Sequence, residues 1–273
     1  ATVFEAHSEL GGMLRVGIPH YRLPREVVDV EVKRLIQMGA EIRTNAQVVS
    51  LDLLFDMGYK AIFVTIGAHK SLKMGVEGEE LSGVIDGVTF LREVNLGLKP
   101  SLGERVAVVG GGNVAIDAAR TALRLGAPRV AILYRRSREE MPADPVGEPD
   151  ASGRRRPVPV PGSEFAEKYD TIISAIGQVP QTPGDFHVQV GRGSTIQVDP
   201  LTLITNRTGV FAGGDVVTGP STVTEALAAG RMAAYRIDEY LQHQYPAAGR
   251  ETLVSLEGKL TPHTRDDSEN RQA

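Results

Sequence analysis

The chain has 273 residues, of which 41% are hydrophobic and 23% are charged. These proportions are typical of a globular protein and argue against a largely disordered chain. The formal net charge of −4 gives no reason to expect a nucleic-acid partner. No apolar run approaches the roughly 20 residues that cross a bilayer, so we expect no membrane segment.

The sequence contains no cysteine. The chain itself therefore cannot form a disulfide, a CxxC redox pair or a cysteine-ligated iron–sulfur cluster, which excludes a disulfide reductase. Its six histidines form no H-x-x-x-H pair or comparable ligand cluster, so we predict no metal site. Redox chemistry in this chain would depend on a bound organic cofactor.

The first predicted element is a strand over residues 1–6, with Glu5 near its end. Pro24 then opens an amphipathic helix that ends at Gly39. Its predicted apolar face consists of Val28, Val32, Leu35 and Ile36. Further strands are predicted over residues 41–43, 47–51 and 59–66, followed by a short helix over residues 88–96.

Residues 105–136 show the most informative pattern, a strand, a glycine turn, a helix and a second strand. Gly110 and Gly112 allow a tight turn and a close approach to a pyrophosphate. That group would lie at the N-terminus of the helix that begins at Asn113. Ala115 occupies the third position, which gives the motif G-x-G-x-x-A.

Two arginines, Arg135 and Arg136, stand where an NAD-preferring domain would place a carboxylate. Paired guanidinium groups bind a ribose 2′-phosphate through charge-assisted hydrogen bonds, whereas a carboxylate would repel it. The pattern predicts an NADP(H) site. The alternative is a generic parallel α/β unit whose glycines only permit close packing.

The rest of the chain continues the alternation of strands and helices. Residues 139–162 are rich in proline, arginine and glycine, which is typical of a loop or an exposed hairpin. Strands are predicted over residues 170–176, 196–198 and 209–212, and a long helix over residues 222–241. This alternation indicates an α/β protein with parallel sheets.

Three separated segments have the features of one flavin site. Glu5 ends a strand, where its carboxylate can accept ribose hydroxyls, and the Gly11-Gly12 pair before Met13 allows the chain to pass close to a cofactor. The second segment combines the strand around Val48 with the strand end at Gly67, where an adenine could lie.

The third segment is Gly213-Gly214-Asp215, followed by the helix that begins near Thr222. The aspartate can accept a hydrogen bond from a ribityl hydroxyl, and the helix start offers free amides and a positive dipole end. Thr222 and Glu225 also have capping-box spacing, so a purely structural role is the alternative.

Six segments carry a family resemblance: FEAHSELGGMLRVGIPHYRLP, VVGGGNVAIDAAR, YRRSREEMPA, GEPDASGRRRPVPVPGSEF, SAIGQVP and GVFAGGDVVTGPSTVTEALAAGR. On these segments, which cover most of the chain, it resembles the NADPH-dependent flavoprotein family that includes the small chain of bacterial glutamate synthase. The same family includes the flavin half of dihydropyrimidine dehydrogenase and the large subunit of ferredoxin:NADP transhydrogenases.

The resemblance implies two Rossmann-like domains, arranged as in the pyridine nucleotide-disulfide reductases but without the redox disulfide. It implies FAD contacts from Glu5, Met13, Arg22, Val48, Gly214, Asp215, Thr222 and Val223. It implies NADP contacts from Gly112, Asn113, Val114, Ala115, Arg135, Arg136 and the turn Ala175-Ile176-Gly177.

We predict a discontinuous FAD-binding domain over residues 1–99 and 163–250, an NADP(H)-binding domain over residues 100–162, and a tail over residues 251–273. Two departures from the family suggest a truncated chain. The strand and G-x-G-x-x-G turn that grip the FAD pyrophosphate are missing, and the NADP(H)-binding domain is shortened near residues 143–147. A chain this short should bind FAD poorly.

The resemblance implies hydride transfer from NADPH to FAD, with electrons passed on to an iron–sulfur domain or subunit and a larger catalytic subunit as partner. Such transfer depends on proximity and orientation, so we predict no catalytic acid or base. We expect a cytoplasmic protein, most similar to the glutamate synthase small chain. The alternatives are a transhydrogenase-type or other flavin subunit, and a non-catalytic docking scaffold with degenerate cofactor sites.

Overall fold

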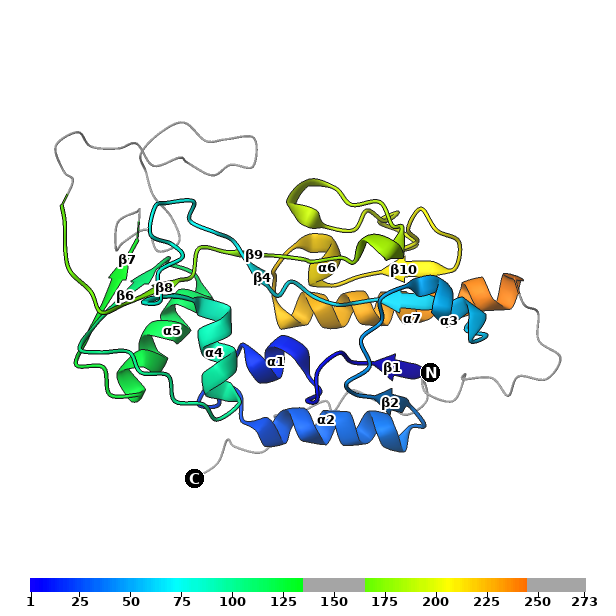
Figure 1. Ribbon diagram of the computed structural model, residues 1–273. Coiled ribbons are helices and arrows are strands. Elements are labelled where there is room, and N and C mark those ends of the chain that lie inside the picture. The colour runs from blue at the N-terminus through cyan, green and yellow to red at the C-terminus, as the bar shows by residue number, and fades with distance from the viewer. Residues whose placement is uncertain (135–164, 245–273) are drawn as a thin grey trace, which may run out of the picture.

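The structure, a computed structural model, describes residues 1–134 and 165–244 (Figure 1). Arg135, Arg136, the shortened segment near residues 143–147 and the tail over residues 251–273 lie outside the described residues.

A four-stranded parallel sheet forms one part of the molecule. It contains β5 (Val84–Asp86), β6 (Arg105–Val109), β7 (Arg129–Leu133) and β8 (Thr171–Ser174) in the order β5-β8-β6-β7. The predicted α/β class with parallel sheets is confirmed. Two of these strands, β5 and β8, lie outside residues 100–162, and the proposed domain boundaries stay a prediction.

Helices α4 (Gly87–Asn95) and α5 (Asn113–Arg124) pack against this sheet (Figure 1). The buried face of α5 contains Ala115, Ala118 and Ala122, all fully buried. Alanine favours helix and has only a methyl group to pack, so α5 can lie close to the valine-rich strand β6. The sequence pattern of strand, glycine turn and alanine-rich helix thus builds this core directly.

Two pairs of parallel strands form the other part of the molecule. Strand β1 (Thr2–Phe4) pairs with β2 (Glu41–Arg43), and β3 (Ile62–Val64) pairs with β10 (Val210–Ala212). A hydrophobic cluster joins both pairs to the neighbouring loops, since Phe4 packs against the same buried residues as β3 and β10.

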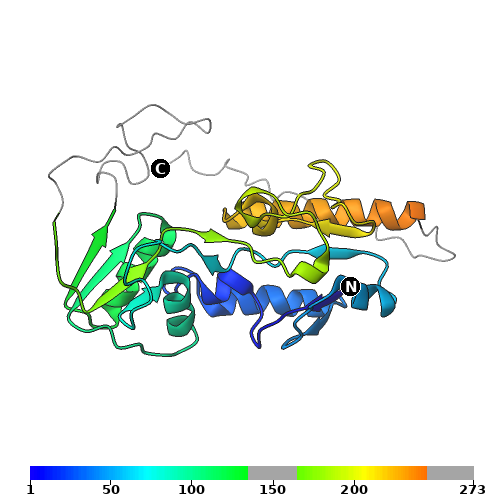
Figure 2. The same ribbon diagram turned by 45° about the horizontal axis from the view of Figure 1, so that its top comes forward.

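The link between the two parts is an antiparallel pair of short strands. Strand β4 (Lys70–Ser71) leaves β3 toward β5, and β9 (Gln178–Val179) returns from β8 toward β10. Figures 1 and 2 both show β4 and β9 between the four-stranded sheet and the part that contains β10 and α7.

The longest helices are α2 (Arg25–Gln37) and α7 (Val223–Gln244), and α1 (Gly12–Val16) precedes α2. Helix α2 begins after Pro24, and the chain turns at Gly39 with φ 92°. Its predicted apolar face is only partly correct. Val28 is buried, whereas Leu35 and Ile36 are about half exposed.

Two predicted strands are wrong. Residues 47–51 form no strand; Ser50 instead begins helix α3 (Leu51–Asp56), and its hydroxyl accepts a hydrogen bond from the amide of Asp52. Residues 196–198 make a single bridge, from Ile196 to Val190. Between β9 and β10 the chain forms two short 3-10 helices, η2 (Gly184–Phe186) and η3 (Arg192–Ser194). Helix α6 (Asp215–Thr218) follows β10.

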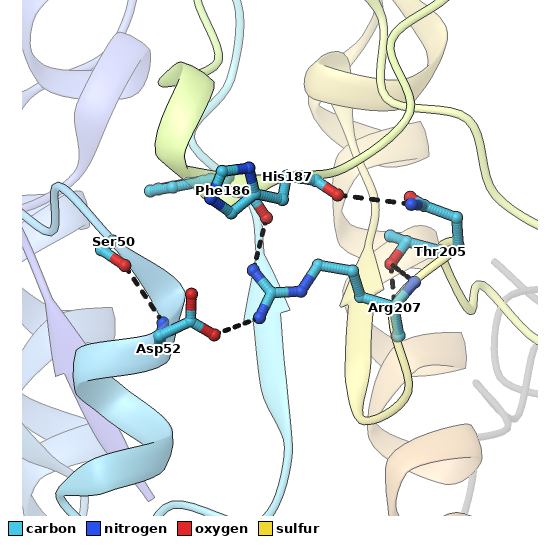
Figure 3. Close-up of polar contacts among 7 residues, drawn as sticks. Ser50, Asp52, Phe186, His187, Thr205 and Arg207 are labelled. Atoms are coloured by element: carbon cyan, nitrogen blue, oxygen red, sulfur yellow. Dashed lines mark hydrogen bonds and ion pairs between the residues drawn. The ribbon is translucent and has the colours of Figure 1, made fainter.

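A polar network fixes this irregular segment to α3 (Figure 3). The guanidinium of Arg207 pairs with the carboxylate of Asp52 and donates a 2.7 Å hydrogen bond to the carbonyl of Phe186. The neighbouring Asn206 amide donates to the carbonyl of His187. One arginine thus connects α3 to the chain around Phe186.

Candidate nucleotide-binding site

The glycine turn follows β6 at the carboxyl edge of the four-stranded sheet. Gly110 has φ 139°, which side chains rarely adopt. A methyl group on it would overlap the carbonyl oxygen of Ala175 and lie 2.9 Å from its carbonyl carbon. The turn is held on both sides, because the Gly110 amide donates to Leu133 and the Ala175 amide donates to Val109.

The N-terminus of α5 opens directly from this turn. Gly112 is the residue before the helix and no side chain caps it, so the amides of the first turn lack the usual hydroxyl or carboxylate acceptor. Nothing lies within 4 Å of where a Gly112 Cβ would be, and both Gly112 and Asn113 are exposed. This open, uncapped helix start fits a pyrophosphate group.

Two further motif residues contribute backbone rather than side chain. Ala115 is fully buried in the core, and the side chain of Val114 points at the start of α4, 3.3 Å from the Cβ position of Gly87. Their amides nevertheless belong to the first turn of α5, beside Asn113.

Tyr134, the last described residue before the predicted arginines, lies against the turn. Its ring is 2.5 Å from the Cβ position of Gly111, so only glycine fits there. The chain therefore leaves β7 next to the glycine turn.

The turn Ala175-Ile176-Gly177 runs beside the glycine turn, as parallel pairing of β8 with β6 requires. Gly177 has φ 136°, and its carbonyl accepts a hydrogen bond from Leu72. Ile176 is 40% exposed. The structure thus brings together all the described residues predicted to contact NADP.

A second group of predicted residues meets at the ends of β3 and β10. Gly67 follows β3 with φ 69°, and Gly214 follows β10 with φ 74°. The Cβ position of Gly214 is 3.6 Å from the hydroxyl of Thr65. Because β3 and β10 are parallel neighbours, their two glycine turns lie at the same edge.

Asp215 and the start of α7 form one polar unit in this group. Partial burial raises the pKa of the Asp215 carboxyl, and its oxygen accepts a 3.3 Å hydrogen bond from the Ser221 amide. Thr222 and Glu225 exchange the two hydrogen bonds of a capping box. The structural role of these two residues is therefore present. The capping box uses the amides of Thr222 and Glu225, and it does not use those of Val223 and Thr224 in the first turn of α7.

The predicted residues at the N-terminal end are more dispersed. The carboxylate of Glu5 accepts a 2.9 Å hydrogen bond from the His7 amide, and Val48 packs on the hydrophobic cluster around β3 and β10. His69 lies next to Gly67, and burial lowers its pKa, with a smaller contribution from Arg92. Glu5 is close enough to His69 to oppose this shift.

The remaining predicted residues, Gly12, Met13 and Arg22, lie in and after α1. Met13 folds back over Gly17, and Gly12 has φ 48°. The Arg22 guanidinium pairs at 2.6 Å with Asp117 on α5, so in this structure it contacts the nucleotide-type unit. Sequence reasoning missed Asp117, although a carboxylate within the alanine face of a helix was a signal for a buried pair.

The described residues contain no cluster of histidine and carboxylate side chains able to hold a metal ion. In the same part of the chain, none of the helices has both the length and the apolar character needed to traverse a membrane.

A parallel sheet with a glycine turn and an uncapped helix start is typical of dinucleotide-binding α/β proteins. The chain belongs to the pyridine nucleotide-disulphide oxidoreductase family. The sequence model of this family matches residues 11–147 and 151–230. The predicted resemblance to the glutamate synthase small chain group is confirmed, as is the reductase-like fold without cysteine.

Among its relatives, the beta subunit of the NADP(+)-dependent formate dehydrogenase of Moorella thermoacetica is 46% identical, over 88% of this chain and 40% of that subunit. A putative glutamate synthase [NADPH] small chain of Cereibacter sphaeroides is 32% identical, over 88% of this chain and 71% of that protein.

The fold resembles that of FprA from Mycobacterium tuberculosis in complex with NADPH. The TM-score is 0.68 with 14% identity, over 89% of this chain and 77% of that one. This chain spans less than half of the formate dehydrogenase subunit that it matches.

Proposed function

We propose that this chain is the flavin module of an NADPH-dependent oxidoreductase. Bound FAD would supply the chemistry of accepting a hydride from NADPH and releasing electrons singly to iron–sulfur clusters of a partner. The observation that carries this proposal is the uncapped start of α5 at Gly112, set beside the Ala175–Gly177 turn. The family membership agrees with it.

The residues of the chain bind and orient. The first-turn amides of α5 would hold the NADPH pyrophosphate, and Arg135 with Arg136 would hold the 2′-phosphate. Gly67, Gly214, Asp215 and the first turn of α7 would line the FAD. No side chain is assigned a proton-transfer step, because alignment of two rings is what hydride transfer needs.

The proposed partner is an iron–sulfur protein of a larger assembly. The identity to a formate dehydrogenase beta subunit, 46%, exceeds that to a glutamate synthase small chain, 32%. We therefore place a formate-dehydrogenase-type assembly ahead of a glutamate-synthase-type one, with an iron–sulfur partner in both. A transhydrogenase-type assembly is a third option, and a cytoplasmic location stays a prediction.

An anaerobic NADPH titration of FAD-reconstituted protein tests the activity. We expect the flavin absorbance to bleach, and with NADH to bleach only at much higher concentration. Arg135→Ala should weaken NADPH binding at least about tenfold through loss of a charge-assisted contact. The matched control is Arg192→Ala, which removes an exposed charge elsewhere.

Two outcomes would contradict the proposal. One is protein that takes up no FAD even with a large excess of the cofactor, which would favour a docking scaffold. The other is NADPH affinity that Arg135→Ala leaves unchanged.

A further inference from the structure

A cavity lies far along α5 from the glycine turn, where the last turns of α4 and α5 meet the segment between α1 and α2. Its volume is about 290 Å³, and its walls include His20, Arg25, Asn95, Thr121 and Arg124. The glycine turn precedes the first turn of α5, whereas Thr121 and Arg124 belong to its last turns. The cavity is therefore separate from the candidate nucleotide site.

Two buried polar groups on its walls have no hydrogen-bond partner among the described residues. One is the hydroxyl of Thr121, a residue only 5% exposed, and the other is the Nη2 of Arg25. The Nη1 of Arg25 donates two long hydrogen bonds, of 3.3 Å to the carbonyl of Leu14 and of 3.4 Å to the carbonyl of Ile18. Buried donors without acceptors are costly, so an acceptor placed here is favourable.

The charge balance of the cavity is positive. Arg25 and Arg124 contribute two guanidinium groups, and the lining contains no carboxylate. The C-terminal ends of α4 and α5 oppose them with roughly half a negative charge each, which leaves a net of about one positive charge. Burial, and then the neighbouring Arg15, lowers the pKa of Arg25, while Asp29 and Glu26 oppose this shift.

The guanidinium group of Arg124 is held in place by two contacts. Its guanidinium carbon lies 3.8 Å from the ring centroid of Tyr21, and its Nη1 donates to the carbonyl of Arg120. Tyr21 and Arg124 are both exposed, so the cavity reaches the surface.

We propose that this cavity is a binding site for a small oxyanion, a phosphate or carboxylate group, held by Arg25, Thr121 and Arg124. The cavity volume lies near the lower end of the range for ligand pockets, about 300 Å³. It is large enough for a phosphate or carboxylate group. The site does not depend on the proposed oxidoreductase function.

Calorimetric titration of the full chain with inorganic phosphate, and separately with succinate, tests the proposal in low-salt buffer. Binding of either probe supports it, and their ratio tells phosphoryl compounds from carboxylates. Thr121→Val, which keeps the side-chain shape, should weaken binding about threefold or more, and Arg124→Gln about tenfold or more. Arg124→Lys should retain most of it, and Arg192→Gln, with the same charge change, should leave it unaltered.

Three results would overturn the proposal. One is the absence of binding heat for both probes up to about 10 mM. Another is binding that neither Thr121→Val nor Arg124→Gln weakens. The third is phosphate binding that only Arg135→Gln abolishes, because that anion would then occupy the nucleotide site. Circular dichroism of each variant verifies that it is folded.

Discussion

The Nη1 of Arg22 lies 2.6 Å from the Oδ2 of Asp117, and 95 residues separate them in the chain. Arg22 follows α1, and Asp117 lies on α5 behind the glycine turn. The Asp117 side chain is 6% exposed, whereas the Arg22 side chain is 43% exposed. The second carboxylate oxygen of Asp117, Oδ1, has no hydrogen-bond partner among the described residues. The pair therefore ties the N-terminal segment to the nucleotide-type unit, and its two members bear very different desolvation.

This asymmetry predicts unequal costs for the two single variants. Arg22→Gln leaves a buried carboxylate unpaired and should lower the free energy of unfolding by about 2–3 kcal/mol. Asp117→Asn leaves an arginine that water can solvate and should cost only about 1 kcal/mol. Urea unfolding measures both.

The double variant Arg22→Gln with Asp117→Asn should be more stable than Arg22→Gln alone. The exposed pair Arg34–Glu31 on α2 is the control, and Arg34→Gln should cost at most about 0.5 kcal/mol. Equal losses for Arg22→Gln and Asp117→Asn would contradict this account of the pair.

The glycine turn predicts a contrast between neighbouring glycines. Gly110→Ala combines a strained φ with the overlap against Ala175 and should destabilise the fold by at least about 2 kcal/mol. Gly112 has φ −85° and open space around it, so Gly112→Ala should destabilise the fold by only about 1 kcal/mol or less, the cost of alanine at a helix start. Its methyl group should instead weaken NADPH binding, by about tenfold, which fluorescence titration measures. Tight NADPH binding by Gly112→Ala would argue against a pyrophosphate at this helix start.

His69 predicts a pH dependence of stability. Burial, reinforced by Arg92, lowers its pKa in the folded chain below the ordinary value of about 6.5. The unfolded chain then binds a proton that the folded chain does not, so this stabilising contribution is complete above about pH 6.5 and declines as the pH falls below it.

The measurement is the urea midpoint at about pH 7.5 and about pH 5.5. His69→Gln should reduce the loss between the two values, and His243→Gln, an exposed change on α7, should leave the loss as it is. An identical loss in the His69 variant and the unaltered protein would remove His69 as the cause.

The Arg207 network in Figure 3 predicts a local loss of stability. Arg207→Met keeps most of the side-chain length but removes the ion pair with Asp52 and the bond to the Phe186 carbonyl. We expect a decrease in the free energy of unfolding of about 1–2 kcal/mol. Arg236→Met, whose side chain is more exposed, is the comparison. A smaller loss for Arg207→Met than for Arg236→Met would contradict the role of the network.

The sequence alone determined the elements whose signals are local. The run from β6 through α5 to β7 could be predicted because strand hydrophobicity, the glycines and the alanine stripe all act within about 30 residues. Helix starts after Pro24 and near Thr222 followed from the same kind of local rule.

Only the tertiary structure decided what depends on distant contacts. The placement of β8 between β5 and β6, the exposure of Leu35 and Ile36, and the choice of Asp117 as the partner of Arg22 follow from packing between remote segments. The error at residues 47–51 has the same origin, because a short apolar run has similar propensity for strand and helix. Local sequence restricts the backbone of each segment, but burial and pairing energies depend on which other segments reach it.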